Sequence, residues 1–145
     1  MNSKYHFEEL PEPEFRSNFD ITHSISSGVT FSTNKLQMAA GVNWRTGKPF
    51  TPPVPGDEIV DDNINYAAAN SDQLNDYLRL DISTIYTTQL SNKTDLQAGI
   101  SIWNLLNKEN IINTFFRVDN LGNSQQVIQT SLGITPNATI KFLFN

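Results

Sequence analysis

The sequence predicts an all-β protein, an antiparallel up-and-down meander of about five main strands with long loops on one side. Apolar and polar residues alternate with the two-residue period of a strand, short and long connections follow each other in turn, and no segment has a helical period. The clearest alternation is LRLDISTIYTTQL at 78–90. There, apolar or neutral residues from Leu78 to Tyr86 alternate with polar residues that include Arg79 and Asp81.

The strands and connections follow a regular order along the chain. Residues 1–17 are polar, contain prolines and are expected to form a loop. The main strands are expected at 18–32, 36–45, 77–90, 95–105 and 137–144. Tight turns are expected at 33–35 and 91–94, and long connections at 46–76 and 106–136. The second long connection holds two further strands around the turn DNLGN, at 111–118 and 125–132.

Composition excludes several classes of function. The net charge of −5 and the pI of about 4.8 argue against a nucleic-acid partner. The 145 residues include no cysteine, so disulfides, thiol nucleophiles and thiolate metal sites are excluded. There is no apolar run of about 18 residues, as a membrane helix requires, and no apolar signal segment at the N-terminus. No Ser/His/Asp constellation, phosphate loop or paired-carboxylate site stands out, so we expect no enzyme and no cofactor.

Acidic residues and one histidine are the candidate metal ligands. Asp57, Glu58, Asp61 and Asp62 are close in sequence, and hard cations such as calcium take several carboxylate oxygens. Their spacing is not that of a known calcium loop, which favours solvated loop charge. His23 is expected on the apolar side of its strand, where a lone ring lies at an interface more often than it binds a metal. We therefore expect no metal site.

The apolar side of each strand can face either a soluble core or membrane lipid, and these two cases correspond to two structural classes. The apolar sides of the main strands contain no charged residue, as both a soluble core and a lipid-facing surface require. An Arg or Lys facing lipid at the bilayer midplane costs about 2–4 kcal/mol. The alternation of short turns and long loops favours an outer-membrane barrel, in which one side carries the long loops. A self-contained soluble antiparallel β-barrel or sandwich that binds a small apolar ligand is the alternative, and an adhesin-like surface module is a third.

Four stretches carry a resemblance to a known family. They are NWRTGKPFTPP (43–53), YLRLDISTIY (77–86), LQAGISIWNLLNKEN (96–110) and ITPNATIKFLF (134–144). Their order and spacing resemble the C-terminal end of TonB-dependent outer-membrane receptors, most closely those of the Bacteroidota, over residues 15–145.

The resemblance implies a location and a set of partners. In that family a 22-stranded transmembrane β-barrel encloses an N-terminal plug. Residues 18–145 would be the last five strands, and residues 1–17 a remnant of an external loop. The barrel would lie in the bacterial outer membrane and contact its lipid, the plug and the remaining strands. A TonB-type energy-coupling protein would act through the missing N-terminal part. The chain is then expected to be a fragment that does not transport by itself.

The resemblance also implies a function and roles for individual residues. The whole receptor would import a nutrient such as an iron chelate, cobalamin or glycan, with loops 46–76 and 106–136 taking part in its capture. Arg79 and Asp81 are expected to form an ion pair on the lumen-facing side. Trp103 with Asn104 and Asn107 is similar to a structural signature near the external rim. Barrel-assembly signals of this family end on an aromatic residue, whereas here Asn145 follows Phe144.

Overall fold

A computed structural model describes residues 4–6, 8 and 14–144. All regular structure in these ranges is β-strand, arranged in antiparallel sheets, which confirms the predicted all-β class. No helix within the described ranges is long and apolar enough to cross a membrane. The chain divides into two compact units. Unit 1 comprises Met1–Ser24, Arg45–Tyr77 and Asn110–Ser131, and unit 2 comprises Ile25–Trp44, Leu78–Glu109 and Leu132–Asn145.

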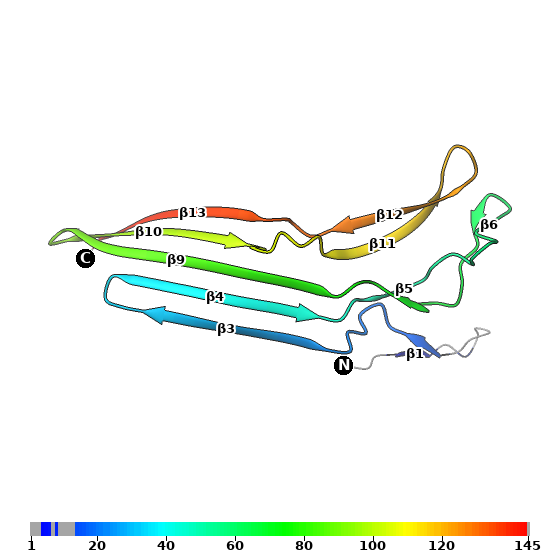
Figure 1. The fold of residues 1–145 in the computed structure, drawn as a ribbon, viewed down its shortest axis with the longest axis horizontal. Coiled ribbons are helices and arrows are strands. Elements are labelled where there is room, and N and C mark those ends of the chain that lie inside the picture. The colour runs from blue at the N-terminus through cyan, green and yellow to red at the C-terminus, as the bar shows by residue number, and fades with distance from the viewer. Residues whose placement is uncertain (1–3, 7, 9–13, 145) are drawn as a thin grey trace. The chain divides into compact units, whose positions relative to one another are not determined.

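Unit 2 is built on one open five-stranded sheet. Its strands are β3 (Ser24–Ser32), β4 (Leu36–Arg45), β9 (Tyr77–Ser91), β10 (Thr94–Trp103) and β13 (Thr135–Phe144). They lie side by side in the order β13-β10-β9-β4-β3, so each main strand is next to its neighbour in sequence (Figure 1). This order confirms the predicted meander. The sheet is open and is not a closed barrel.

The register of the strands shows that the apolar residues share one face. Leu96 in β10 lies opposite Thr88 in β9 and Phe142 in β13. Ala98 lies opposite Tyr86 and Ile140 in the same two strands. Directly opposed residues of antiparallel strands point to the same side. We call this side the apolar face; its principal residues are Val29, Phe31, Met38, Ala40, Ile82, Tyr86, Leu96, Ala98, Ile100, Ile102, Ile140 and Phe142.

The apolar face is not covered. Among residues 4–6, 8 and 14–144, no hydrophobic side chain is classed as buried. On the apolar face, Val29 is 69% exposed, Ile100 59% and Ile140 71%. Contiguous exposed apolar surface marks an interaction site in a folded protein. Unit 2 therefore does not enclose a core of its own.

The opposite face of the sheet is mainly polar. Gln97 lies opposite Thr87 and Lys141, and Ser101 lies opposite Ser83. On β3 and β4, hydroxyl and amide groups occupy this face, and the Ser26 Oγ donates a hydrogen bond to the Asn43 Oδ1 over 2.8 Å. Ile85 and Trp103 are also on this face. Apart from Ile85 and Trp103, the larger apolar side chains of the sheet's central strands are thus on the apolar face, and the charged side chains are on the polar face.

Two asparagine side chains, buried Asn104 and exposed Asn107, end the fourth strand and hold the loop that follows. The strand was expected to continue to residue 105, but β10 ends at Trp103 because Asn104 adopts the left-handed conformation, with φ of 52°. The Asn104 amide group donates to the carbonyls of Lys108 and Leu132 over 3.0 and 3.1 Å. Asn107, also left-handed, accepts a hydrogen bond from the Ile134 N–H over 2.9 Å. The Trp-Asn signature is therefore a strand terminator.

The first main strand begins later than expected. It was predicted from residue 18, whereas β3 begins at Ser24. The Asp20 N–H donates to the Ser17 carbonyl over 2.9 Å, which makes a tight turn. The Asp20 carboxylate is 1% exposed and forms an ion pair with Arg16 at 3.0 Å. This local turn replaces the extended chain that the alternation indicated, so His23 precedes the strand and is not on its apolar side.

Among its described residues, unit 1 has four short antiparallel strand pairs. They are β1 (Lys4–His6) with β2 (Glu14–Arg16), β5 (Pro49–Phe50) with β8 (Asp72–Gln73), β6 (Ile59–Val60) with β7 (Asn63–Ile64), and β11 (Ile111–Val118) with β12 (Ser124–Thr130). The last pair was expected. The stretches 1–17 and 46–76 were expected to lack strands, and that expectation was wrong. Asn145 lies outside the described residues, so the expectation about the chain's last residue stays a prediction.

Replacing Asn104 is expected to destabilise unit 2. Asn104→Gly keeps the left-handed conformation but leaves the Lys108 and Leu132 carbonyls without their amide donor, so the free energy of unfolding should fall by about 2 kcal/mol. Asn104→Ala adds the backbone strain of a Cβ at positive φ, about 1 kcal/mol more. Urea denaturation measures both losses. The same replacements at exposed Asn34 are the control, and equal effects at the two positions would contradict this role.

Candidate functional site

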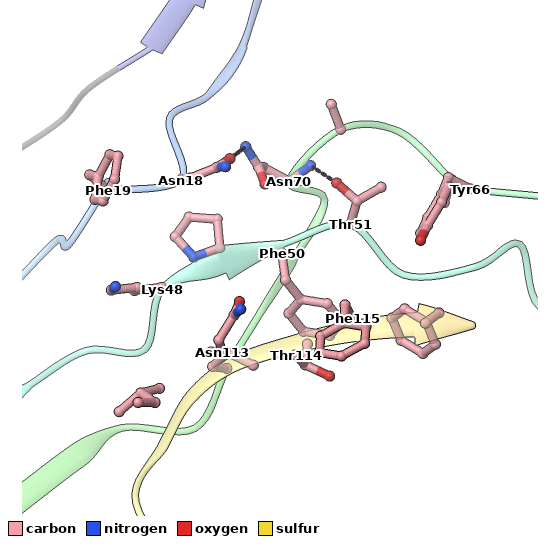
Figure 2. A pocket seen from close by; sticks show the side chains of 16 residues that line it. Asn18, Phe19, Lys48, Phe50, Thr51, Tyr66, Asn70, Asn113, Thr114 and Phe115 are labelled. Carbon is pink, nitrogen blue, oxygen red and sulfur yellow. Dashed lines mark hydrogen bonds between the residues drawn. The ribbon is translucent and has the colours of Figure 1, made fainter. Parts of the chain in front are cut away.

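Unit 1 contains a pocket of about 760 Å³, formed by the segment between β5 and β8, by β11 and by residues 18–19 (Figure 2). Volumes of this size are typical of small-molecule binding sites. Five aromatic rings, several amide side chains and one lysine line it. The lining includes no Asp or Glu.

A glycine allows two segments to approach closely beside the pocket. A Cβ on Gly47 would lie 1.7 Å from the Leu74 carbonyl oxygen, so no other residue fits without moving the backbone. Around this close approach, the Leu74 N–H donates to the Lys48 carbonyl over 2.9 Å, and the Gln73 amide donates to the Gly47 carbonyl over 2.8 Å. These contacts join the two ends of the 46–76 segment. The Thr-Gly-Lys-Pro motif therefore has a structural role, and it positions Lys48 and Pro49 in the pocket wall.

A buried asparagine fixes a second side of the pocket. Asn70 is 6% exposed, and its side-chain amide donates to the Arg16 carbonyl and to the Asn18 Oδ1, both over 2.6 Å. Its backbone N–H donates to the Thr51 Oγ1 over 2.9 Å. Through its side chain and its backbone N–H, Asn70 therefore joins three segments of unit 1 that are distant in sequence.

Aromatic rings make the apolar wall. The rings of Phe50 and Phe116 lie nearly parallel, with centroids 6.4 Å apart and planes at 22°. Tyr66 meets Phe116 edge-on, at 6.5 Å and 74°. Such ring arrangements contribute favourable energy beyond the burial of their surface. This wall presents ring surface to whatever occupies the pocket.

Lys48 is the charged residue of the lining. Its Nζ lies 5.6 Å from the centroid of the Phe19 ring, at the range of a cation–π contact. The pocket is therefore positively charged, although the whole chain carries −5.

The candidate calcium residues have turn-forming roles. Asp61 and Asp62 are the left-handed residues of the β6–β7 turn, with φ of 50° and 61°. The Asp57 Oδ2 accepts from the Asn65 amide over 3.2 Å, and the Glu58 carboxylate accepts from the Gly56 N–H over 3.0 Å. Within the described ranges, no group of three or more His, Cys, Asp or Glu side chains has the geometry to hold a metal ion.

Arg79 and Asp81 form the ion pair that their spacing predicted. The Arg79 Nε and Nη2 both lie 2.9 Å from the Asp81 Oδ2. The Asp81 Oδ1 accepts the backbone N–H of Asn104 over 2.9 Å. The carboxylate thus helps to hold the end of β10. The pair belongs to unit 2 and takes no part in lining the unit 1 pocket.

Individual pocket residues were not identified from the sequence, although the two loops that supply most of them were expected to capture a ligand. Gly47, Lys48 and Pro49 carried a signal, because they lie in a recognised motif. Asn18 and Phe19 were assigned to the first main strand, and Asn70 comes from a segment without a regular period, so none of the three was expected in a pocket. Searches against protein-family models, curated proteins and solved structures find no match to the chain.

Gly47→Ala is expected to disrupt the close approach beside the pocket, because its Cβ would overlap the Leu74 carbonyl. The free energy of unfolding of unit 1 should fall by about 2–3 kcal/mol, the range for overpacking a tight site. Hydrogen exchange at the Leu74 amide measures the loss. Gly41→Ala is the matched control, because its Cβ would lie 3.8 Å from the nearest atom. Unchanged protection in Gly47→Ala would contradict the close approach.

The turn between β11 and β12 is expected to loosen in acid. The backbone N–H groups of Asn123 and Leu121 donate to the Asp119 carboxylate and hold its pKa below the ordinary value of 3.8. A lowered folded pKa means that this stabilisation is complete above the unfolded value and is lost as pH falls through the folded one. Carboxyl NMR shifts should give an Asp119 midpoint below 3.8. The Asn123 amide shift should follow it, and Asp119→Asn should abolish the transition; a midpoint at or above the ordinary value would contradict the argument.

Proposed function

We propose that this chain is the C-terminal part of a TonB-dependent outer-membrane receptor, which takes up a nutrient such as an iron chelate, cobalamin or glycan. The five strands of unit 2 would be part of the barrel wall in the bacterial outer membrane. The observation that carries the proposal is the exposed, charge-free apolar face of the sheet, opposite a polar face.

Lipid accounts for this face better than water does. Large side chains such as Val29, Ile140 and Phe142 are more than half exposed, and no charged residue interrupts them. A surface that faces hydrocarbon excludes charge for energetic reasons. The Arg79–Asp81 ion pair would then face the lumen, where water and a plug domain would meet it.

The edges of the sheet support a larger assembly. Strands β3 and β13 are the first and last in the order of the described sheet, so each has one edge without a neighbour in that sheet. Open edges are not tolerated in hydrocarbon, because their N–H and C=O groups have no partner there. The proposal therefore assigns the remaining barrel strands to these two edges. Uptake by this chain alone is not proposed.

The pocket of unit 1 would take part in substrate capture. It is built from the two long connections that a receptor exposes on its outer side, together with residues 18–19. A ligand held by loops and plug would enter after a TonB-type coupling protein moves the plug.

Fractionation tests the membrane assignment. The expressed chain should be found in the insoluble fraction or require detergent, because its apolar face has no cover. A monodisperse monomer that unfolds cooperatively in plain buffer would contradict the proposal and would favour the soluble β-protein.

The two tryptophans give a sharper test. Trp44 belongs to the apolar phase of β4, whereas Trp103 lies on the polar face. In micelles of a brominated detergent, the fluorescence of Trp103→Phe, which retains Trp44, should be quenched strongly. Trp44→Phe, which retains Trp103, should be quenched at least twofold less. Equal quenching of the two variants would contradict the assignment of faces to lipid and lumen.

A further inference from the structure

We propose that the unit 1 pocket binds a small aromatic carboxylate, with Lys48 as the partner of its negative charge. The inference rests on the proposed function in one respect, since it names the chemical class of ligand for the site assigned to substrate capture. Three observations support it: the positive charge of Lys48, the exposed aromatic rings of the lining, and the hydrogen bonds that polar lining groups already make within the protein.

The pocket has a positive charge that the chain does not neutralise. Lys48 takes part in none of the ion pairs found among residues 4–6, 8 and 14–144. The lining carries no carboxylate, whereas the chain as a whole is acidic. An ammonium group partly enclosed by apolar surface is less screened than one in water, so an anion binds it more strongly there. A ligand with one negative charge would complete this site.

The aromatic wall favours a flat ligand. Phe50 and Phe116 lie nearly parallel, and Tyr66 stands edge-on to Phe116. Tyr66 is 49% exposed and Phe115 44%, so ring surface remains available for contact. Another aromatic ring would extend this cluster in offset or edge-on geometry.

The polar side chains of the lining argue against a polyhydroxylated ligand. The Asn70 amide donates to Arg16 and Asn18, and the Asn113 amide donates to the Gln129 Oε1 over 3.0 Å. The Thr114 hydroxyl is bonded to the Val127 carbonyl over 3.2 Å. A sugar needs several hydrogen-bonding groups that point toward it, whereas these groups are already used within the protein. The ammonium of Lys48 is the charged group that the lining offers a ligand, and the Tyr66 hydroxyl is a further, neutral one.

The test uses 4-fluorophenylacetate and its neutral isostere, 4-fluorophenylacetamide. Fluorine NMR titration of the full chain in detergent gives both dissociation constants, and empty micelles correct for partition into detergent. The acid should bind at least five times more tightly than the amide. Lys48→Met should weaken binding of the acid about tenfold, as expected for loss of one charge-assisted contact. The amide should change less than twofold.

Three further variants separate charge from fold and from ring contact. Lys48→Arg should retain the acid's affinity within about threefold, which shows that the site tolerates substitution. Lys141→Met, in unit 2, removes a cation elsewhere and should leave both ligands unaffected. Tyr66→Leu should weaken the acid and the amide by the same factor, because it removes ring surface and no charge.

Several outcomes would overturn the proposal. They are equal affinity for acid and amide, an acid affinity that does not depend on Lys48, no binding at millimolar concentration, and glucose binding as tightly as the acid. The fractionation and tryptophan experiments do not involve Lys48. A soluble chain that binds the acid through Lys48 would contradict the receptor proposal and support the binding proposal. A chain that requires detergent but does not bind the acid would contradict the binding proposal alone.

Discussion

The backbone hydrogen-bond ladder of the five-stranded sheet is the interaction on which unit 2 depends. No hydrophobic side chain of the described residues is buried, so the packing of a core does not hold these strands together. The pairing of β10 with β13 runs without a break from Thr94 opposite Phe144 to Trp103 opposite Thr135. A slip of one residue would move every side chain to the other face. The ladder therefore determines both the stability of the sheet and the separation of its two faces.

Where the ladder ends, buried polar side chains take the place of a core. Asn104 and Asn110 are each 1% exposed, and Asn70 is 6% exposed. Each loop has backbone N–H and C=O groups that need partners once they are removed from water. An asparagine side chain supplies a hydrogen-bond donor and an acceptor together. One residue can therefore bond to backbone groups of two different strand ends or loops. The same solution occurs in both units, at Asn104 beside the sheet and at Asn70 beside the pocket.

The sequence predicts the strands better than it predicts the site. Residues 36–45 and 111–118 are strands as expected, because the signal for a strand lies within the segment itself. The start of the first strand was wrong, because the burial of Asp20 and its ion pair with Arg16 depend on structure that alternation does not report. The pocket joins three segments that are distant along the chain, and no periodic pattern links them. Apart from the two long loops, only the Thr-Gly-Lys-Pro motif around Gly47 indicated the pocket in the sequence.

The two units differ in which side chains they expose and which they bury. The sheet separates apolar from polar side chains and has no core, which suits a wall with lipid on one side and water on the other. The loops of unit 1 instead bury amide groups and cluster aromatic rings around the pocket. A soluble sandwich would need the apolar side chains of its sheet to pack against a second layer. The exposure of Val29, Ile100 and Ile140 is opposite to that requirement, and this exposure is the reason for proposing that the sheet is part of a membrane wall.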